Sequence, residues 1–570
     1  MHESPFILFS WHAPFLPALQ SFIKEKTSNH PENCVLLIPN SRPWRYIVDG
    51  YRTSGFHGLL PKVVTLDETI RAWFIHNNLT LFPHANVLDT IPLLYSVVRD
   101  LSLKAPSLKA LSAEQGLQQF WPIGRCLAQL LDEIYRQGKT PKDTHLNEEG
   151  PAKAFVPLLQ ALGQIHEGFR QKLASHHLST RSIDFWRAAC EAESIPSFLQ
   201  PKESHPVIIA GFSVLEGAEE KLLKRLWGKG CVIALHTDPA LATKTQTPHH
   251  AVICHERWIE RWNADVLLFD GENGTQAHEK RHNPGPTIRY YAGYDSHSEL
   301  YGLRRDLSEA GTKTGSHAIL LMNPSLLLPV LHYLPCKDVN IAIGYPFKRT
   351  LLGQLITIML GLHERKEGES YSTRDLLHFL HHPFIQQCIM HCFKKVRESD
   401  SCGQRGTEED TLKTEEKTVH KKGPYQSFKT LEESLLSGKS LQTVQALLEA
   451  CDTNERTLLT TFFDLFITAF ECVQTLADLA TAFDKAMAFL RLHGVRFQTY
   501  PLEQEALARF LENIVPELGA NAMQNEVIPF ALQKTILEAL LEDERIAFEA
   551  DPLTGLQLLG LSETQLLHFE

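Results

Sequence analysis

The segment PVIIAGFSVLEGAEEKLLKRLWGKGCVIALH, residues 206–236, decides the fold class. Its two ends, PVIIAGF and CVIALH, are short runs of aliphatic and β-branched residues, which are typical of buried strands. The stretch between them, EGAEEKLLKRLWGKG, has the pattern of an amphipathic helix. A strand, a helix and a second strand in close succession predict a parallel sheet of the α/β class.

The same alternation of strand and helix precedes and follows this segment. PFILFS, CVLLIPNS and KVVTL each lead into a helical pattern, and Asp67 is placed to cap the third of these helices. TIRYYAGY, HAILLMN and VNIAIGYPF repeat the alternation further along the chain. The sequence therefore predicts two tandem α/β domains with parallel sheets, residues 1–285 and 286–570.

Each predicted domain is interrupted by a block with helical periodicity and almost no strand signal. The first block covers about residues 90–200 and the second about residues 371–549. Inside the second block, residues 394–422 hold 15 charged residues of both signs. Such a stretch buries too little apolar surface to order itself, so we expect a flexible surface loop, with a DNA-contacting arm as the alternative.

Composition narrows the class of protein. The chain has 570 residues, of which 43% are hydrophobic, as is usual for a globular protein. Its net charge of -11 argues against a strongly basic nucleic-acid-binding protein. A local basic channel remains compatible with that total. The N-terminus has no basic leader and no apolar run approaches the length of a membrane helix. With 11 scattered cysteines, we expect reduced thiols in a cytoplasmic protein without a membrane partner.

Two tandem α/β domains with helical insertions are the plan of a superfamily 1 helicase. Local sequences that sharpen this likeness occur in order along nearly the whole chain: NCVLLIPNSRPWRYI, LPKVVTLDETI, PVIIAGFSVLEGAEEKLLKRLW, VNIAIGYPFKRT, YSTRDLLHFLHHPFI and GLQLLGLSETQLLHFE. Together they resemble the AddB-type subunit of bacterial AddAB helicase–nucleases, whose shorter members are named PD-(D/E)XK nuclease family proteins. The resemblance is to the helicase-like N-terminal portion of that subunit.

The resemblance implies a role in double-strand break repair and recombination. The expected partners are DNA ends, single-stranded DNA and an AddA-type helicase–nuclease subunit that supplies the motor. The family's PD-(D/E)XK nuclease domain, with its Mg²⁺, lies beyond the equivalent of residue 570, so no cofactor is expected in this chain. One alternative is that the chain is a fragment of a longer ATP-dependent exonuclease. A remoter alternative is a protein-interaction scaffold that does not bind DNA.

The last segment, GLQLLGLSETQLLHFE, is expected to re-enter the second sheet. Its second apolar run, QLLHFE, predicts the opening of a further buried strand. On this interpretation Phe569 lies near the edge of an incomplete sheet. In the family a Glu-Thr-Arg is usual here, whereas this chain has Glu563, Thr564 and Gln565.

The sequence lacks the groups that hydrolyse ATP. A phosphate-binding loop needs glycines, a Lys and a Ser or Thr, and it should follow the first strand. That position reads SWHAPFLPAL, from Ser10 to Leu19, without glycine or lysine. Ala210 and Gly211 stand where a helicase places its Mg²⁺-binding carboxylates. We therefore predict an ATPase-dead helicase fold, and no catalytic residue is assigned.

The acidic residues that follow do not replace those carboxylates. Glu216, Glu219 and Glu220 are expected at a helix N-terminus, where the helix dipole favours negative charge.

The candidate DNA-binding residues follow two predicted strands. In helicases of this class the loop after the second strand contacts the single-strand backbone, and here it holds Asn40, Ser41, Arg42, Trp44 and Arg45. The arginines would neutralise phosphates and Trp44 would stack on a base. The alternative is that Trp44 and Tyr46 pack against the helix that follows the strand and that the arginines are solvated.

Three further sets complete the candidates. Lys348 and Arg349 precede a helix N-terminus, which attracts phosphate, although glycine and proline already explain the turn there. Glu563 and Thr564 are carried over from the resemblance. A third set, Cys388, His391 and Cys392, has ligand types that suit Zn²⁺, but no second pair closes the site, and small buried apolar cysteines are the favoured interpretation.

Overall fold

The computed structural model divides the chain into two compact units. The first unit comprises Met1–Ile343 and Phe548–Glu570, and the second comprises Gly344–Ala547. The structure describes residues 4–103, 116–143, 156–191, 194–243, 247–269, 288–310, 317–391, 424–437, 440–449, 453–494, 499–548, 553, 555–564 and 567–569. The predicted boundary at residue 285 and the charged loop 394–422 lie outside the described residues.

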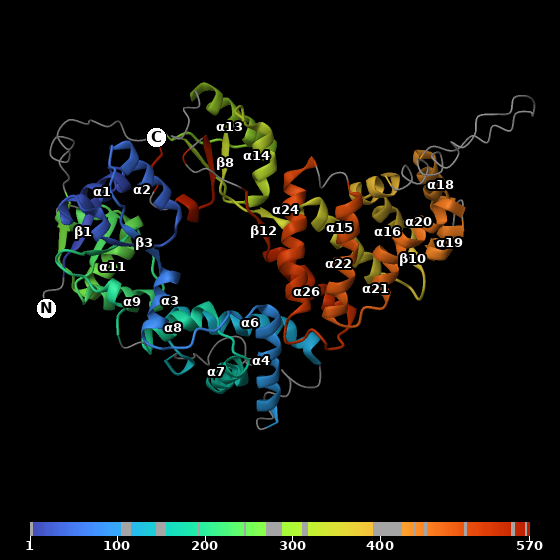
Figure 1. The fold of residues 1–570 in the computed structure, drawn as a ribbon, viewed down its shortest axis with the longest axis horizontal. Helices are drawn as coiled ribbons and strands as arrows, with labels where there is room; N and C mark the ends of the chain where they lie inside the picture. The colour runs from blue at the N-terminus through green and yellow to red at the C-terminus, as the bar shows by residue number, and fades with distance from the viewer. Residues whose placement is uncertain are drawn as a thin grey trace, which may run out of the picture. The chain divides into compact units, whose positions relative to one another are not determined.

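The first unit contains a six-stranded parallel sheet, here called the large sheet, with helices on both of its faces (Figure 1). Its order is β3-β2-β4-β5-β1-β6. The strands are β1 (Phe6–Ser10), β2 (Val35–Ile38), β3 (Lys62–Thr65), β4 (Val207–Ala210), β5 (Val232–Thr237) and β6 (Val266–Leu268). All neighbouring pairs are parallel, which confirms the α/β prediction. The sequence did not predict β6, a partly exposed edge strand of three residues.

Alternating side chains of the strands build a core on each face of the large sheet. Phe6 and Leu8 of β1 belong to one buried cluster, whereas Ile7 and Phe9 belong to the other. This is the period of two that a strand buried on both faces requires. One face is covered by α1 (Phe15–Lys26) and α2 (Arg42–Thr53). The other face is covered by α3 (Leu66–His76), α8 (Arg181–Cys190), α9 (Gly217–Trp227) and α11 (Ile253–Trp262).

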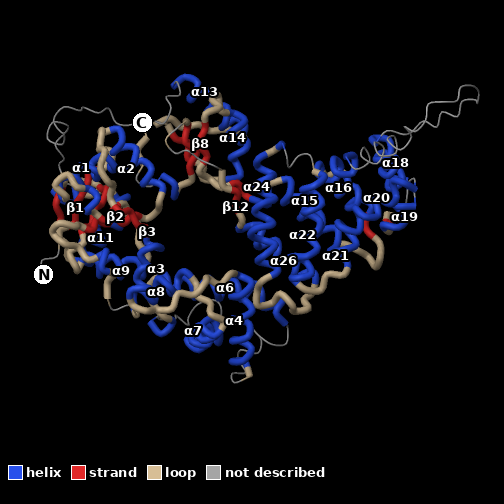
Figure 2. The backbone as a smooth tube through the Cα atoms, in the orientation of Figure 1, coloured by secondary structure: helices blue, strands red, loops and turns tan. Residues whose placement is uncertain are grey.

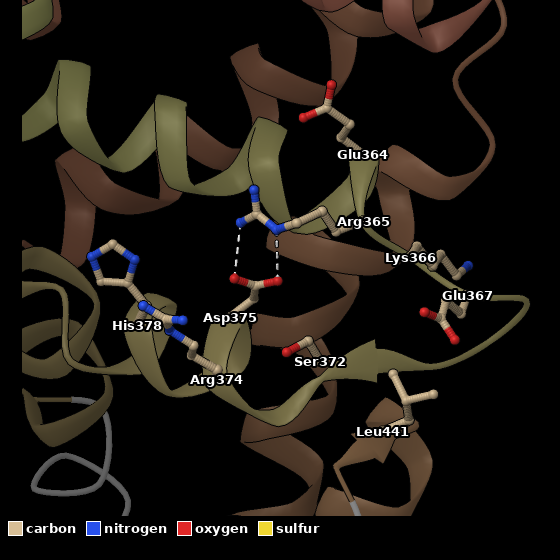
Figure 3. A pocket seen from close by; sticks show the side chains of 9 residues that line it. All are labelled: Glu364, Arg365, Lys366, Glu367, Ser372, Arg374, Asp375, His378 and Leu441. Atoms are coloured by element: carbon tan, nitrogen blue, oxygen red, sulfur yellow. Dashed lines mark hydrogen bonds and ion pairs between the residues drawn. The ribbon is translucent and has the colours of Figure 1, made fainter.

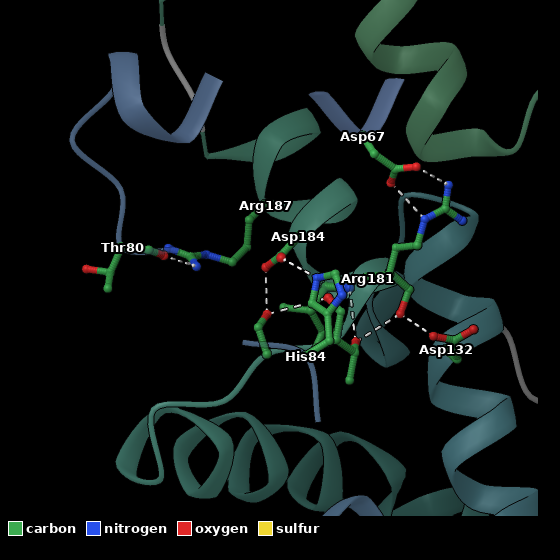
Figure 4. A network of polar contacts seen from close by, with 11 residues as sticks. Asp67, Thr80, His84, Asp132, Arg181, Asp184 and Arg187 are labelled. Carbon is green, nitrogen blue, oxygen red and sulfur yellow. Dashed lines mark hydrogen bonds and ion pairs between the residues drawn. The ribbon is translucent and has the colours of Figure 1, made fainter. Parts of the chain in front are cut away.

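Helices fill the segment between β3 and β4. They are α3, α4 (Val87–Ser102), α6 (Gly116–Arg136), α7 (Val156–Ser175) and α8. The start of α8 is held by a polar network (Figure 4). The carboxylate of Asp184, which is buried, accepts a hydrogen bond of 2.6 Å from the Ser179 hydroxyl and lies 2.9 Å from His84 Nε2. The Ser182 hydroxyl donates to Asp132 of α6.

The N-terminus of α3 corrects one expectation. Its cap is Thr65, whose hydroxyl accepts the backbone N–H of Glu68, and the Glu68 carboxylate accepts the N–H of Thr65 in return. Asp67 lies in the first turn instead and pairs with Arg181 at 2.8 Å. A capping box satisfies two helix N–H groups at once, so Thr65 displaces Asp67 from the cap position.

A three-stranded parallel sheet, here called the small sheet, also belongs to the first unit. Its order is β7-β13-β8, with β7 (Ala318–Leu320), β13 (Leu556–Leu559) and β8 (Val339–Ile341). The return of the last segment to the second sheet is therefore confirmed, since β13 is its fully buried central strand. Two helices accompany this sheet, α13 (Ser296–Ala310) and α14 (Leu327–Tyr333).

Two strand predictions near the small sheet are wrong. Residues 288–294 of TIRYYAGY form no strand, because the ring of Tyr291 lies against α13 and its hydroxyl bonds to Asp306. Residues 567–569 form no strand either, because Leu567 packs on the core beside α1 and α2 instead. In both places side-chain packing takes precedence over strand propensity.

The second unit is mainly helical (Figure 2). Its helices are α15 (Leu351–Glu364), α16 (Thr373–Leu380), α18 (Pro424–Ser437), α19 (Val444–Glu449), α20 (Thr453–Phe463), α21 (Ala469–Glu471), α22 (Leu476–His493), α24 (Pro501–Arg509), α25 (Val515–Gly519) and α26 (Phe530–Asp543). Its strands pair antiparallel as β10 (Tyr371–Ser372) with β11 (Leu441–Gln442) and β9 (Tyr345–Pro346) with β12 (Arg545–Ile546). Its core includes a group of phenylalanine rings, in which Phe462 stacks on Phe466 with ring centroids 4.7 Å apart.

Two general properties follow from the described residues. Among them, no helix combines the length and the apolar character that crossing a membrane requires. Their cysteines carry free thiols. Burial raises the pKa values of Cys34 and Cys231 to about 12, so these two thiols are protonated at neutral pH.

Candidate nucleic-acid interface

The ends of three strands lie together at one edge of the large sheet. In the large sheet β4, β5 and β1 are neighbours and all run parallel. Their carboxyl ends therefore lie at one edge, the edge at which open α/β sheets bind ligands. The structure thus brings together the loop after β1 and the loop after β4, which are the two positions where ATP chemistry was sought in the sequence.

The loop after β1 is held by contacts with residues at the end of β5. The Trp11 N–H donates to the Thr237 carbonyl at 3.0 Å, and His236 Nε2 lies 3.2 Å from the Ala13 carbonyl. The ring of Phe15 stacks on His236 with centroids 5.1 Å apart. Burial lowers the pKa of His236, so its ring is neutral at neutral pH and offers no positive charge to a phosphate.

The loop after β4 carries no carboxylate where the strand ends. Gly211 has a φ of 85°, which turns the chain away from the sheet, and the Phe212 carbonyl lies 3.0 Å from His255 Nε2. The Glu219 carboxylate accepts the backbone N–H of Glu216 at 3.1 Å, and Glu220 pairs with Arg261 at 2.9 Å. These glutamates begin α9, as predicted, and are engaged in structural contacts.

The loop after β2 leads directly into α2. Asn40 Oδ1 accepts the Arg42 N–H at 3.1 Å and so shapes the turn, while Ser41 precedes the helix without a side-chain cap bond. Trp44 is half-buried against the core beside α1 and α2. Arg45 is exposed on the first turn of α2.

Arg42 reaches from α2 to the small sheet. Its Nη2 donates to Gln557 Oε1 at 3.2 Å, and the Asn340 amide donates to the same oxygen. Gln557 is fully buried in β13 and Asn340 nearly so in β8. This contact joins residues 515 positions apart and was not visible in the sequence, because no local pattern pairs them.

Lys348 and Arg349 lie in a short 3₁₀ turn before α15. Lys348 Nζ pairs with Glu542 at 2.8 Å. At the start of α15, the Glu503 carboxylate accepts the N–H groups of Leu351 at 3.1 Å and Leu352 at 3.3 Å. The position that a phosphate would take at this helix N-terminus is therefore filled by a carboxylate of the same chain.

The remaining candidates are placed as follows. Glu563 and Thr564 lie in a 3₁₀ turn after β13, and the Thr564 hydroxyl donates to the Leu561 carbonyl at 2.7 Å. Cys388 is fully buried, which fits the apolar interpretation of this cysteine. Cys392 lies outside the described residues, and within the described part of the chain no group of metal-ligating residues is gathered.

The second unit contains a polar cavity of about 1010 Å³ (Figure 3). It is lined by Glu364, Arg365, Lys366, Glu367, Ser372, Arg374, Asp375, His378 and Leu441. Arg365 forms a two-pronged pair with Asp375, at 2.9 and 2.8 Å. Because charges of both signs line the cavity and Arg365 pairs with Asp375, the cavity presents no dominant charge to a ligand.

Comparison with known proteins leaves the family open. No family model matches the chain, and none of the curated proteins matches it.

Proposed function

We propose that this chain is a DNA-binding, ATPase-dead, helicase-like subunit of a bacterial helicase–nuclease for double-strand break repair. It acts with an AddA-type motor subunit. In this proposal the large and small sheets are the centres of two tandem superfamily 1 helicase-like domains. The helices between β3 and β4 and the second unit are their insertions. The order of local sequences along the chain supports the assignment to this family.

One observation carries the proposal. The loops after β1 and β4 meet at one edge of the large sheet, yet neither carries the groups that ATP hydrolysis needs. Trp11, His12 and Ala13 stand where a phosphate loop would need glycine and lysine, and Ala210 ends β4 without a carboxylate. A helicase-like architecture that lacks both sets of groups supports a role in holding DNA for a separate motor.

Two measurements on the purified chain test the proposal. We expect no ATP turnover above a mock preparation with or without DNA, and we expect binding to a single-stranded tail that weakens as salt rises. DNA-stimulated ATP hydrolysis would refute the ATPase-dead assignment. A complete lack of salt-dependent DNA binding would instead favour the protein-interaction scaffold.

A further inference from the structure

Arg42 is a charged side chain whose partner in the fold is neutral. The side chain is half-buried, and its Nη2 donates to Gln557 Oε1 at 3.2 Å. Within the described part of the chain this is its one side-chain hydrogen bond, and no carboxylate there pairs with it. Its Nε is buried and has no acceptor among the same residues. An unsatisfied buried donor and a half-buried charge without a counter-ion both carry a cost in free energy, so this contact requires an explanation.

A second hydrogen bond fixes the orientation of the Gln557 amide. Its Nε2 donates to the Gly555 carbonyl at 3.3 Å, which leaves Oε1 as the atom that accepts from other residues. Oε1 accepts from Asn340 of β8 as well as from Arg42. Gln557 is fully buried and Asn340 is 5% exposed. The acceptor of the arginine is therefore a buried oxygen that has two donors.

Arg42 can leave this oxygen without exposing a new defect in the small sheet. Gln557 Oε1 retains the hydrogen bond from Asn340 when the arginine moves away. The backbone of Arg42 is held separately, because its N–H donates to Asn40 Oδ1 at 3.1 Å and the next residue, Pro43, is buried. The side chain can thus change its acceptor while α2 and β13 keep their places.

A phosphate group suits the guanidinium better than the Gln557 amide does. It offers oxygen atoms that accept two parallel N–H bonds, and it carries the opposite charge. Gln557 offers a single oxygen, which Asn340 already shares. Exchange of Gln557 for a phosphate would engage further N–H groups of Arg42 and supply a counter-ion.

We propose that the hydrogen bond between Arg42 and Gln557, here called the Arg42 switch, is an autoinhibitory contact. In the free chain it holds the arginine against the small sheet, and a phosphate of a bound DNA strand takes over the arginine from Gln557. Since Arg42 is free in only a fraction of the chains, its contribution to DNA affinity is reduced by that fraction. This inference rests on the proposed function, which supplies the DNA strand.

Fluorescence anisotropy of a labelled oligothymidylate with the full chain tests the Arg42 switch. Gln557→Met removes the acceptor and frees Arg42, so it strengthens binding by roughly 10- to 100-fold, the equivalent of one hydrogen bond to a charged group. Gln557→Glu supplies a charged acceptor, holds Arg42 more firmly and weakens binding. Neither substitution changes the affinity when Arg42→Gln is also present.

The matched control is Gln533→Met in the second unit, which does not contain Arg42. Gln533 is fully buried like Gln557, and its Nε2 also donates to a backbone carbonyl, that of Ile528 at 3.0 Å. The same change of side chain at this position leaves the affinity for oligothymidylate unchanged. Tryptophan emission, which comes from the first unit alone, checks that the variants at residue 557 are folded.

The outcomes separate the Arg42 switch from the proposed function. If the unaltered chain binds oligothymidylate and Gln557→Met binds it no more tightly, the switch is refuted and the proposed function stands. If Gln557→Met strengthens binding even with Arg42→Gln present, a loosened fold explains the gain and the switch is again refuted.

A lack of DNA binding by every variant would refute the proposed function, and ³¹P NMR of inorganic phosphate would then decide the switch. The switch stands, with free phosphate as its ligand, if Gln557→Met binds phosphate more tightly than the unaltered chain does. It is refuted if the two bind phosphate equally.

Discussion

At the start of α15, a side chain from another helix accepts the hydrogen bonds of two backbone N–H groups, and this contact can be tested by substitution. The Glu503 side chain is 6% exposed, and its carboxylate accepts the backbone N–H groups of Leu351 and Leu352. Glu503→Ala leaves the buried N–H of Leu352 and the partly buried N–H of Leu351 without this partner. A fully buried unsatisfied donor costs about 1–3 kcal/mol and the partly buried donor costs less, so we expect a local destabilisation of about 2–4 kcal/mol. Glu503→Gln, which retains an acceptor oxygen but not the charge, loses less.

The matched control is Glu505, which lies two residues after Glu503 on α24. Glu505 pairs with Arg509 at the surface, at 2.9 Å, with both side chains more than a third exposed. Such exposed pairs contribute about 0–1 kcal/mol, so Glu505→Ala is nearly neutral. A comparison of the two alanine variants therefore separates the capping role of Glu503 from a general effect on α24.

Hydrogen exchange detected by mass spectrometry is the suitable assay. All 8 tryptophans lie between residues 11 and 262, so tryptophan emission reports the first unit alone and serves as an internal control. Amides of α15 exchange roughly 30- to 900-fold faster in Glu503→Ala if opening costs about 2–4 kcal/mol less. Exchange as slow as in Glu505→Ala would refute the capping argument. Changed tryptophan emission would show that the substitution acts outside the second unit.

Three further outcomes are expected. Burial lowers the pKa of His363 to about 4, so between pH 6.5 and 4 the unfolded state binds more protons than the folded state. Acidification over this range therefore lowers the free energy of unfolding of the second unit by up to about 3 kcal/mol. Hydrogen exchange across this range measures the loss, which His363→Phe removes. Phe6→Ala destabilises the first unit by about 3–5 kcal/mol in urea unfolding followed by tryptophan emission, because the ring is fully buried. Asp184→Ala destabilises the first unit by about 1–3 kcal/mol, because the carboxylate is buried and accepts a hydrogen bond from a hydroxyl. Its control is Asp67→Ala, which removes the exposed pair with Arg181 and changes stability by less than about 1 kcal/mol.

Local sequence patterns predicted the large sheet well. Five of its strands were recognised as apolar runs, and the burial of β1, β2, β4 and β5 on both faces produces the continuous apolar signal in the sequence. β6 was not predicted, because three residues at a partly exposed edge show almost no periodicity of apolar residues. The segment 288–294 was predicted as part of a strand because TIRYYAGY precedes a helical pattern, yet its contacts with α13 depend on tertiary packing that no local pattern records.

The contacts of the candidate site residues were harder to predict than the strands, because they too depend on tertiary packing. Arg42 was singled out correctly as a basic residue after β2, but its hydrogen bond to Gln557 requires two sheets to meet. Likewise, Lys348 precedes a helix N-terminus as expected, but the carboxylate that fills that N-terminus comes from Glu503, more than 150 residues later. Composition identifies groups able to bind phosphate, whereas their partners follow only from the fold.

These contacts share one consequence for how the chain would hold DNA. The N–H groups at the start of α15 donate to Glu503, the first turn of α3 is closed by Thr65 and Glu68, and Arg42 donates to Gln557. A phosphate would have to displace each of these partners before it bound there, at a cost in hydrogen bonds already made. The proposed DNA binding therefore meets a smaller opposing free energy at side chains that already face solvent, where no such displacement is required.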